Sequence, residues 1–255
     1  MSVVEQVLDE LSAVQAPGGF LERTLQACGL RDSYATVETP VGDYFIAWRG
    51  SSVSAVFRAD RGRESFLGWF ARELRRPLRG AERVPERIRQ ALRETRGRSL
   101  SYDLSHLTAF EQAVLGKTLE IPRGEVRSYG WVAREIGRPS AVRAVGTALR
   151  HNPIPLLIPC HRVVRGDGEL GNYAGGQPEL KKDILKGEGL DLAWLQDLAR
   201  RRKRFSGSRT THVFCNPTCA HARRTRPVNL IEFSSEQEAR AAGYRPCRTC
   251  RPVAA

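Results

Sequence analysis

The sequence predicts three folded units: a small α/β N-terminal domain with an antiparallel sheet, a mostly α-helical central domain that contains a helix-turn-helix, and a small α+β C-terminal module. Short β-type runs occupy residues 34–57, helical periodicity dominates residues 108–149, and four of the six cysteines lie within residues 215–250. The predicted boundaries are 1–30 for an N-terminal helical extension, 31–103 for the α/β domain, 104–190 for the central domain, 191–207 for a basic linker and 208–255 for the C-terminal module.

Composition and charge favour a polyanionic partner. The 255 residues carry a net charge of +13, and 36 of the 41 basic residues are arginine. Residues 191–255 hold 13 basic against 5 acidic residues, an excess of +8, with a dense arginine run at 200–204. A solvated linker or surface helix explains that run equally well. No apolar run approaches the ~20 residues that span a bilayer, and residues 1–5 show no basic leader, so we expect a cytoplasmic protein without a membrane partner.

The N-terminal segments follow in order. A capping box of Ser2 and Glu5 predicts a helix over 2–14, which Pro17 ends; a second helix carries Cys28, most simply as a small core residue. The runs 34–39, 44–48 and 53–57 are separated by turns and predict an antiparallel meander. An amphipathic helix over 66–74 follows, and nothing in this block indicates chemistry.

The central segment reads as helices joined by short turns. A second capping box, Thr108 with Glu111, begins a helix that runs to about 119. A short helix over 129–136 is stopped by Gly137, and another helix begins at Pro139–Ser140 and runs to 149. Two short helices with a tight Gly/Pro turn are typical of a helix-turn-helix, although many helical hairpins bind nothing. A hairpin turn at 165–168, a glycine-rich loop at 171–176 and a helix over 178–186 complete the segment.

The run Ile158-Pro159-Cys160-His161-Arg162-Val163 carries the strongest chemical indication. It places a thiol between a rigid proline and a potential base. The thiolate is the attacking species, and a neighbouring imidazole or cation is the usual way to obtain one near neutral pH. Cys160 is therefore the candidate nucleophile.

The C-terminal cysteines are spaced Cys215-x3-Cys219-x27-Cys247-x2-Cys250. Four thiolates in two close pairs are the ligand set of a closed tetrahedral zinc site. A module of this size with few apolar residues folds poorly without metal. We therefore expect one Zn²⁺ in a four-cysteine site that stabilises the C-terminal module, with free or disulfide-bonded cysteines as the weaker alternative.

Residues 107–189 resemble the O6-alkylguanine-DNA alkyltransferases, also called methylated-DNA–protein-cysteine methyltransferases. The resemblance rests on several motifs in the same order, and a looser one covers residues 34–57. The motifs are Phe110-Glu111-Gln112, Ile121-Pro122-Arg123-Gly124, Ser128-Tyr129, Arg143-Ala144-Val145-Gly146, Asn152-Pro153, the Cys160 run and Gly171-Asn172-Tyr173.

This resemblance implies irreversible, stoichiometric transfer of the alkyl group from O6-alkylguanine, and also from O4-alkylthymine, to Cys160. His161 would act as a base through a water, Glu188 would orient His161, and Asn152 would hold the loop. The expected partner is double-stranded DNA that carries alkylated bases. No small-molecule cofactor is expected, and the protein is expected to act as a monomer.

The same resemblance implies that the damaged base leaves the stack. Arg143 would fill the gap and Tyr129 would help rotate the phosphate. The carbonyls of Cys160 and Val163 would read the guanine edge. Tyr173 would line the pocket, and the N–H of Ala174 would face O6; many relatives carry serine there.

Residues 209–252 resemble the Ada-type metal-binding domain. In that family one zinc thiolate, at the position of Cys215, accepts a methyl group from DNA methylphosphotriesters. A purely structural zinc module is the equal alternative. The domain is usually N-terminal and followed by an AraC-type regulatory domain, so its C-terminal place here argues against a transcriptional role.

Two other classes of function stay open. A non-enzymatic sensor or DNA-binding regulator would bind alkylated bases without repairing them, although such relatives lack the reactive cysteine. A cysteine hydrolase would turn over repeatedly, but it would not explain the helix-turn-helix or the arginines.

Overall fold

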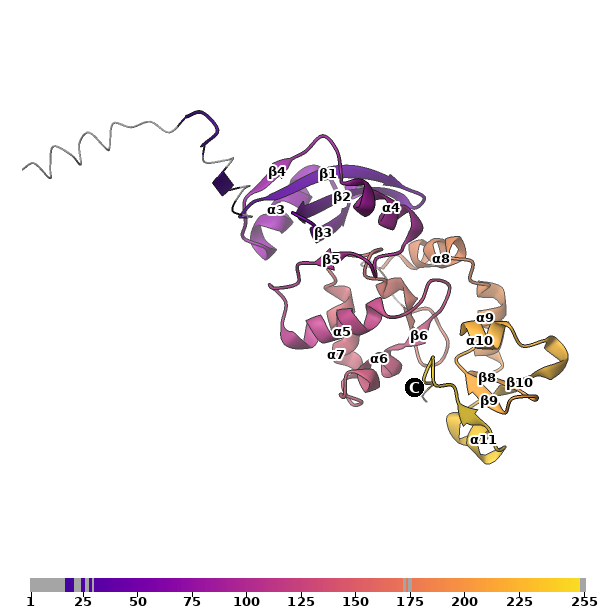
Figure 1. Ribbon diagram of the computed structural model, residues 1–255. Coiled ribbons are helices and arrows are strands. Elements are labelled where there is room, and N and C mark those ends of the chain that lie inside the picture. The colour runs from indigo at the N-terminus through magenta and orange to yellow at the C-terminus, as the bar shows by residue number, and fades with distance from the viewer. Residues whose placement is uncertain are drawn as a thin grey trace, which may run out of the picture.

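The computed structural model describes residues 17–20, 24–25, 28, 30–171, 173 and 176–252. The predicted helix over 2–14 and most of the second helix lie outside the described residues. Cys28 is exposed, so its predicted place in the core is wrong. In Figure 1 the described part of this segment extends away from the β-sheet.

The N-terminal domain is a five-stranded sheet of order β4-β1-β2-β3-β5. The three central strands form the predicted antiparallel meander. The two edge strands pair in parallel, so the prediction of a purely antiparallel sheet is wrong at its edges. Each edge strand is reached through a helical crossover and is too short to show alternation in the sequence. The elements are β1 (Asp32–Thr39), β2 (Gly42–Arg49), β3 (Ser52–Arg58), η1 (Ala59–Arg61), α3 (Arg63–Glu73), β4 (Leu78–Gly80), α4 (Glu86–Glu94) and β5 (Ser101–Tyr102).

Both faces of this sheet are buried. One face packs on α3 through an aromatic cluster in which Phe45 and Phe66 stack with ring centroids 5.2 Å apart. The other face joins α4 and the central domain in one continuous apolar core. Because the Val56 N–H also donates to the Pro153 carbonyl at 2.9 Å, the sheet holds the segment that leads to Cys160.

The central domain is mostly helical, as predicted. The Thr108–Glu111 capping box is present at the start of α5. The second helix of the helix-turn-helix begins at Val142 rather than Ser140, because Arg138 to Ala141 form a hydrogen-bonded turn first. The elements are α5 (Ala109–Leu119), β6 (Arg127–Ser128), α6 (Tyr129–Glu135), α7 (Val142–Arg150), η2 (Cys160–Arg162), β7 (Val163–Val164) and α8 (Pro178–Gly187).

The segment 191–207, predicted as a basic linker, contains helix α9 (Leu192–Arg200). The Asp191 side chain caps it by accepting from the Trp194 N–H at 2.9 Å. Leu192, Leu195 and Leu198 recur every three residues and bury one side of the helix. This apolar spacing outweighs the arginine run that suggested a linker.

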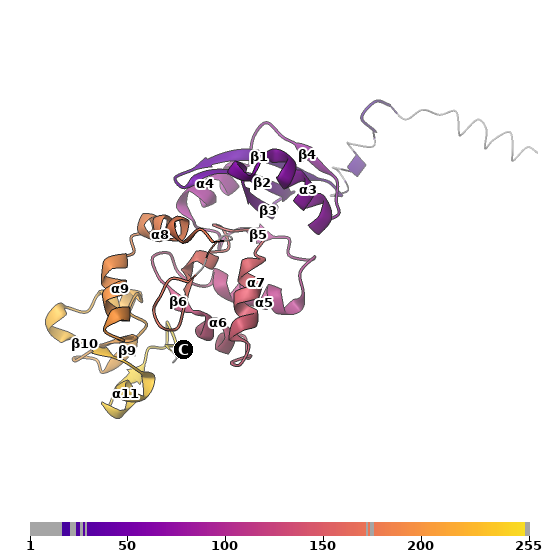
Figure 2. The ribbon, with the colours of Figure 1, turned by 180° about the vertical axis from the view of Figure 1, so that it is seen from behind.

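The C-terminal module is a four-stranded sheet of order β10-β8-β9-β11 with two short helices. It lies against α9 and the central domain, far from the N-terminal sheet (Figures 1 and 2). Its aromatic core centres on Phe214. An added Cβ at Gly207 would lie 2.7 Å from the Phe233 ring, so only glycine fits there. The elements are β8 (Phe205–Ser208), β9 (Val213–Cys215), α10 (Ala220–Arg223), η3 (Pro227–Asn229), β10 (Leu230–Phe233), α11 (Glu236–Ala241) and β11 (Arg245–Pro246).

In the described part of the chain, no helix has the length and apolarity needed to cross a membrane.

Candidate active site and metal centre

Cys160 begins the one-turn helix η2, directly after a proline. Its side chain is nearly enclosed, with the residue 8% exposed. The Asn152 amide donates to the Cys160 sulfur at 3.1 Å and to the Ile158 carbonyl at 2.9 Å. The side-chain oxygen of Asn152 (Oδ1) accepts from the Ile154 N–H at 3.0 Å. Asn152 therefore holds the loop on both sides of the proline and points a donor at the sulfur, in keeping with its predicted place.

His161 and Glu188 form a buried pair. The His161 Nε2 lies 3.0 Å from a Glu188 carboxylate oxygen, and both side chains are at most 1% exposed. Burial lowers the pKa of His161, and the Glu188 hydrogen bond only partly opposes it. The ring is therefore neutral near pH 7, with its proton on the nitrogen that faces the carboxylate. The other nitrogen, Nδ1, is then a buried acceptor, and it has no hydrogen-bond partner among the described residues.

The Glu188 carboxylate accepts hydrogen bonds from other residues besides His161. Although burial raises its pKa, hydrogen bonds from His161 and Arg162 hold the pKa of Glu188 well below its usual range. Arg162 donates through Nε at 2.9 Å and through Nη2 at 2.7 Å. The Thr95 hydroxyl donates at 2.8 Å and the Gly124 N–H at 3.2 Å. Glu188 is thus an ionised carboxylate at neutral pH.

Sequence reasoning missed Arg162 and Thr95 as members of this site. Arg162 lies in the quoted motif but received no role. Thr95 comes from the N-terminal domain, at the left-handed C-cap of α4, and its carbonyl also accepts from Arg162 at 2.7 Å. Nearby, an added Cβ at Gly97 would lie 2.1 Å from the Leu157 carbonyl oxygen. The backbone of the segment after α4 therefore directly contacts the backbone of the segment that leads to Cys160. No local pattern indicates such long-range contacts.

Lys181 is a further residue that the sequence did not single out. It is fully buried on α8, and its ammonium group donates to the carbonyls of Val163, at 2.6 Å, and Leu170. Burial lowers the pKa of Lys181 to about 8. Its charge lies close enough to Cys160 to interact with the sulfur. The Val163 carbonyl, a predicted reader of the guanine edge, therefore already accepts one hydrogen bond, and a carbonyl oxygen has two lone pairs.

The resting Cys160 is a thiol. Burial raises the pKa of Cys160, and the Asn152 hydrogen bond, the Lys181 charge and the Tyr173 hydroxyl act in the opposite direction. Tyr173 is buried, and its ring meets the His161 ring edge-on at 6.3 Å. Its hydroxyl interacts with the Cys160 sulfur, and its predicted place in the wall of a guanine pocket stays a prediction. Ala174 lies outside the described residues.

Tyr129 and Arg143 occupy the first turns of the two helices of the helix-turn-helix. The Ser128 side chain caps α6 by accepting from the Trp131 N–H at 3.0 Å, which places Tyr129 at the helix start. Arg143 is exposed on the first turn of α7, beside Val142, which is 40% exposed. A groove of about 540 Å³ runs from these helix ends to the C-terminal module and is lined by Tyr129, Val142, Arg165, Arg204 and Ser234, among others.

The four C-terminal cysteines come together as predicted. Strand β9 pairs in parallel with β11, which brings Cys215 and Cys247 together at the same end of the two strands. Cys219 is the N-cap residue of α10. All four are buried, and their sulfur atoms lie within 4.8 Å of one another. Hydrogen bonds from Cys215 and Cys250 hold the pKa of Cys219 well below its usual range. This clustered set of soft sulfur donors fits a zinc ion.

Two family matches cover most of the chain beyond residue 108. Residues 109–190 match the family described as "6-O-methylguanine DNA methyltransferase, DNA binding domain". Residues 195–253 match "Metal binding domain of Ada". The second match begins inside α9, which agrees with that helix being more than a linker.

Curated relatives carry the name methylated-DNA–protein-cysteine methyltransferase. The rat protein is 45% identical over 93 residues, which is 36% of this chain and 44% of the rat protein, so the match spans less than half of that relative. The Mycobacterium leprae protein is 37% identical over 144 residues, 55% of this chain and 83% of that protein. The Methanosarcina acetivorans protein is 35% identical over 161 residues, 61% and 97%.

Solved structures show the same likeness. The crystal structure of Mycobacterium tuberculosis OGT in complex with DNA aligns with a TM-score of 0.51 at 30% identity, covering 64% of this chain and 98% of that one. The O6-methylguanine-DNA methyltransferase from Pyrococcus kodakaraensis aligns with a TM-score of 0.51 at 28% identity, covering 62% and 99%. With its Cys160, His161 and Glu188 assembled in a helix-turn-helix domain, this chain belongs to the methylated-DNA–protein-cysteine methyltransferase family and carries an Ada-type metal-binding domain.

Proposed function

We propose that this protein repairs DNA by moving the alkyl group of O6-alkylguanine onto the Cys160 sulfur, once per molecule. The observation that carries the proposal is the Cys160–His161–Glu188 arrangement. A thiol lies next in the chain to a neutral imidazole whose far nitrogen is fixed by a buried carboxylate. Asn152 adds a donor aimed at the sulfur. Family membership supports a reaction in which this sulfur attacks the carbon of an alkyl group rather than the carbon of a carbonyl group.

The residues share the work of one displacement step. The Nδ1 atom of His161 takes the thiol proton through a bridging water, and the Glu188 carboxylate stabilises the imidazolium that forms. The Lys181 charge and the Asn152 amide stabilise the thiolate against the cost of burial. The sulfur then bonds to the alkyl carbon while the carbon–O6 bond breaks. The electron pair stays on the guanine, which takes up one proton and becomes ordinary guanine.

The thioether product explains why each molecule acts once. A carbon–sulfur bond in a buried site has no hydrolytic route back to the thiol. Cys160 is 8% exposed and leaves little room for a second nucleophile. The reaction is therefore stoichiometric, and O4-alkylthymine is a second substrate of the same chemistry.

Recognition of the DNA follows the two short helices. We place Arg143, which is exposed at the start of α7, in the gap left by the extruded base, and Tyr129 beside the rotated phosphate. The carbonyls of Cys160 and Val163 read the guanine edge, with Tyr173 as a wall. The N–H of residue 174 is assigned to O6 by resemblance alone. The protein acts as a monomer on duplex DNA of the nucleoid.

A direct test follows the alkyl group. Duplex DNA with labelled O6-methylguanine is incubated with the protein and with Cys160→Ala and Cys28→Ala variants, and the peptides are identified by mass spectrometry. We expect one label per molecule on Cys160, none on Cys160→Ala, and parental labelling of Cys28→Ala, whose thiol is exposed. Binding without transfer would support the sensor alternative, and more than one turnover per molecule would support a hydrolase.

The metal centre is proposed as one Zn²⁺ held by Cys215, Cys219, Cys247 and Cys250. A bound zinc ion would cross-link the two ends of the module and supply folding energy. The 3% exposure of Cys215 favours this structural role. Methyl acceptance by Cys215 is tested on DNA with a methylphosphotriester and no alkylated base, where a methylated Cys215 peptide would establish it.

A further inference from the structure

Thr95 ends helix α4 in a backbone conformation that threonine rarely adopts. Its φ is 50° and its ψ is 41°, in the left-handed region. The N–H of Arg96, the next residue, donates to the Ala91 carbonyl at 2.9 Å and closes the helix end. Glycine or asparagine usually occupies the left-handed position of such a helix end, because a β-branched side chain is strained there. Strain of this kind persists only where the surrounding structure compensates for it, and it is frequent at functional sites.

Both polar groups of Thr95 reach the active site. The hydroxyl lies 2.8 Å from a Glu188 carboxylate oxygen and also 2.8 Å from the Glu94 carbonyl oxygen. Because the carboxylate is ionised, it is the stronger acceptor for the single hydroxyl hydrogen. The Thr95 carbonyl accepts from Arg162 Nη2 at 2.7 Å. The left-handed Thr95 therefore presents its hydroxyl and its carbonyl to the two partners of one buried ion pair.

The Glu188 oxygen that Thr95 approaches is the one that faces His161. This oxygen, Oε1, lies 3.0 Å from His161 Nε2 and 2.7 Å from Arg162 Nη2. Arg162 is itself held, since its Nη1 donates to the Ile121 carbonyl at 2.7 Å. The last torsion of a glutamate side chain has a broad distribution, so donors at a defined oxygen decide how the carboxylate is turned. Thr95 therefore helps to fix the oxygen to which His161 is bound.

The residues after Thr95 are anchored against the chain that leads to Cys160. The Tyr102 hydroxyl donates to the Gly97 carbonyl at 2.6 Å, and an added Cβ at Gly97 would lie 2.2 Å from the same hydroxyl. Leu156, which precedes the backbone contact with Gly97, is fully buried and has a φ of 69°, a second residue in the left-handed region. Residues 95–97 are thus closely packed and form a fixed support for the active site.

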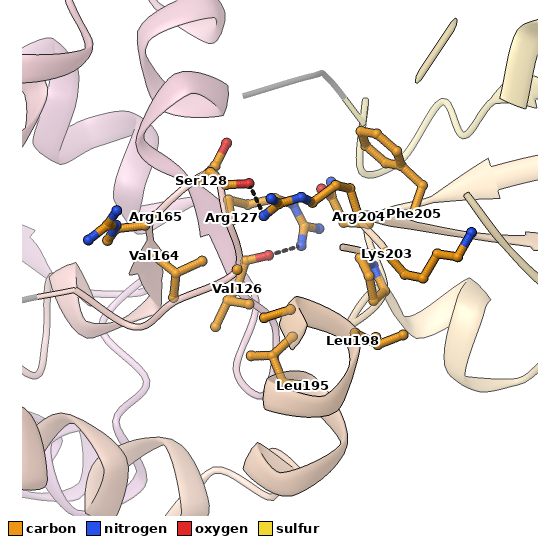
Figure 3. A pocket seen from close by; sticks show the side chains of 15 residues that line it. Val126, Arg127, Ser128, Val164, Arg165, Leu195, Leu198, Lys203, Arg204 and Phe205 are labelled. Atoms are coloured by element: carbon orange, nitrogen blue, oxygen red, sulfur yellow. Dashed lines mark hydrogen bonds between the residues drawn. The ribbon is translucent and has the colours of Figure 1, made fainter. Parts of the chain in front are cut away.

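The C-terminal module meets a different part of the central domain. Figure 3 shows Val126 to Ser128 facing α9 and Lys203 to Phe205 across a small cavity of about 70 Å³. In the part of the chain that the structure describes, the donors to the Glu188 carboxylate are Thr95, Gly124, His161 and Arg162. Three of these residues belong to the central domain and Thr95 belongs to the N-terminal domain. The N-terminal domain is therefore the second unit that reaches the active-site carboxylate.

We propose that Thr95 is a positioning residue for alkyl transfer, supplied by the N-terminal domain. It holds the Glu188 carboxylate in the orientation that His161 needs to act as a base. The strained helix cap is the means, because it directs the hydroxyl and the carbonyl of one residue at Glu188 and Arg162. Thr95 contacts no reacting atom and adds no chemical step. This role rests on the alkyl transfer proposed above.

The test measures single-turnover transfer from O6-methylguanine duplex by the full chain. Thr95→Val keeps the β-branched shape and removes the hydroxyl, whereas Thr95→Ser keeps the hydroxyl. The control is Thr36→Val, the same change at an exposed position of β1. We expect Thr95→Val to lower the maximal transfer rate about tenfold, which is part of what a general base contributes, with the half-saturating DNA concentration unchanged. Thr95→Ser retains most of the rate, and Thr36→Val retains all of it.

A merely structural threonine would give a different pattern. Thr95→Val would then lower the Tm while the folded protein transferred the alkyl group at the parental rate, and this result would overturn the proposal. Equal losses of rate in Thr95→Ser and Thr95→Val would overturn it too, because the hydroxyl would not be the group that matters. We also expect the loss to persist with the free O6-methylguanine base, since Glu188 acts in the chemical step. A loss confined to duplex DNA would contradict the proposed role.

The double variant Thr95→Val/Glu188→Gln tests whether Thr95 acts through the carboxylate. We expect it to react no more slowly than Glu188→Gln alone, because two residues that act through one group are not additive. Additive losses of rate would exclude the route through Glu188. Failure of the proposed function is distinguishable from these outcomes. A parental chain that transfers no alkyl group would remove both the function and the role of Thr95, whereas parental transfer by Thr95→Val would remove only the latter.

Discussion

Replacing Glu188 with glutamine is the sharpest test of the active-site arrangement. The two side chains have nearly the same shape, so the substitution opens no cavity. It removes the negative charge and replaces one acceptor oxygen by an NH₂ donor. Glu188 and Arg162 are 1% and 5% exposed, and the carboxylate accepts from four different residues. Removing one partner of such a buried pair costs about 3–5 kcal/mol, and the oxygen retained by glutamine favours the lower value.

The expected change in unfolding temperature follows from this free energy. For a chain of this size, each kcal/mol moves the Tm by about 2–4 °C, so a loss of ~3 kcal/mol lowers it by roughly 6–12 °C. Single-turnover alkyl transfer at pH 7 falls as well, by about 10²-fold, because the imidazolium formed at His161 loses its counter-ion. The control is Glu179→Gln on the exposed side of α8, whose surface pair with Lys182 is worth less than about 1 kcal/mol.

The pH dependence of the same variant has a definite sign. The pKa of Glu188 is lower in the folded state than its ordinary value of 4.5. Its stabilising contribution is therefore fully present above about pH 4.5 and is lost as pH falls through the folded-state value. The Tm difference between parent and Glu188→Gln is constant through the neutral range and shrinks in acid.

Thermal unfolding followed by circular dichroism, together with quenched-flow transfer from O6-methylguanine duplex, measures both effects. A Tm of Glu188→Gln within about 1–2 °C of the parental Tm would refute the ion-pair reasoning. An unchanged transfer rate in that variant would refute the role of Glu188 as orienter.

Three further predictions concern neighbouring residues. Because burial lowers the pKa of His161, its base form persists below the ordinary value of 6.5, so the transfer rate should fall in acid only below that pH; a midpoint above 6.5 in a pH–rate profile would contradict this. Lys181→Met should destabilise the fold by about 1–3 kcal/mol for each carbonyl group left without its donor, at Val163 and Leu170, and should also slow alkyl transfer. Chemical denaturation and single-turnover assays measure the two effects, and unchanged stability would remove the proposed role of Lys181. Arg143→Ala should slow transfer from duplex DNA about tenfold or more, since extruding a base costs a few kcal/mol. The rate of reaction with the free O6-alkylguanine base should stay the same. Equal losses on both substrates would show that Arg143 does not act in base extrusion.

The features readable in the sequence are those that depend on neighbouring residues. The Thr108–Glu111 capping box, the three central strands and the short helices of the helix-turn-helix each express a local period or a local hydrogen bond. The two cysteine pairs are readable for the same reason, since each pair sits within one short turn. The nucleophile was recognisable because its base follows it in the chain.

The contacts that give those residues their chemistry join segments far apart in sequence, and only tertiary structure decided them. Glu188 meets Thr95 across 93 positions, and Trp131 meets Cys250 across 119. Each such contact depends on how whole units pack, which a local pattern does not encode.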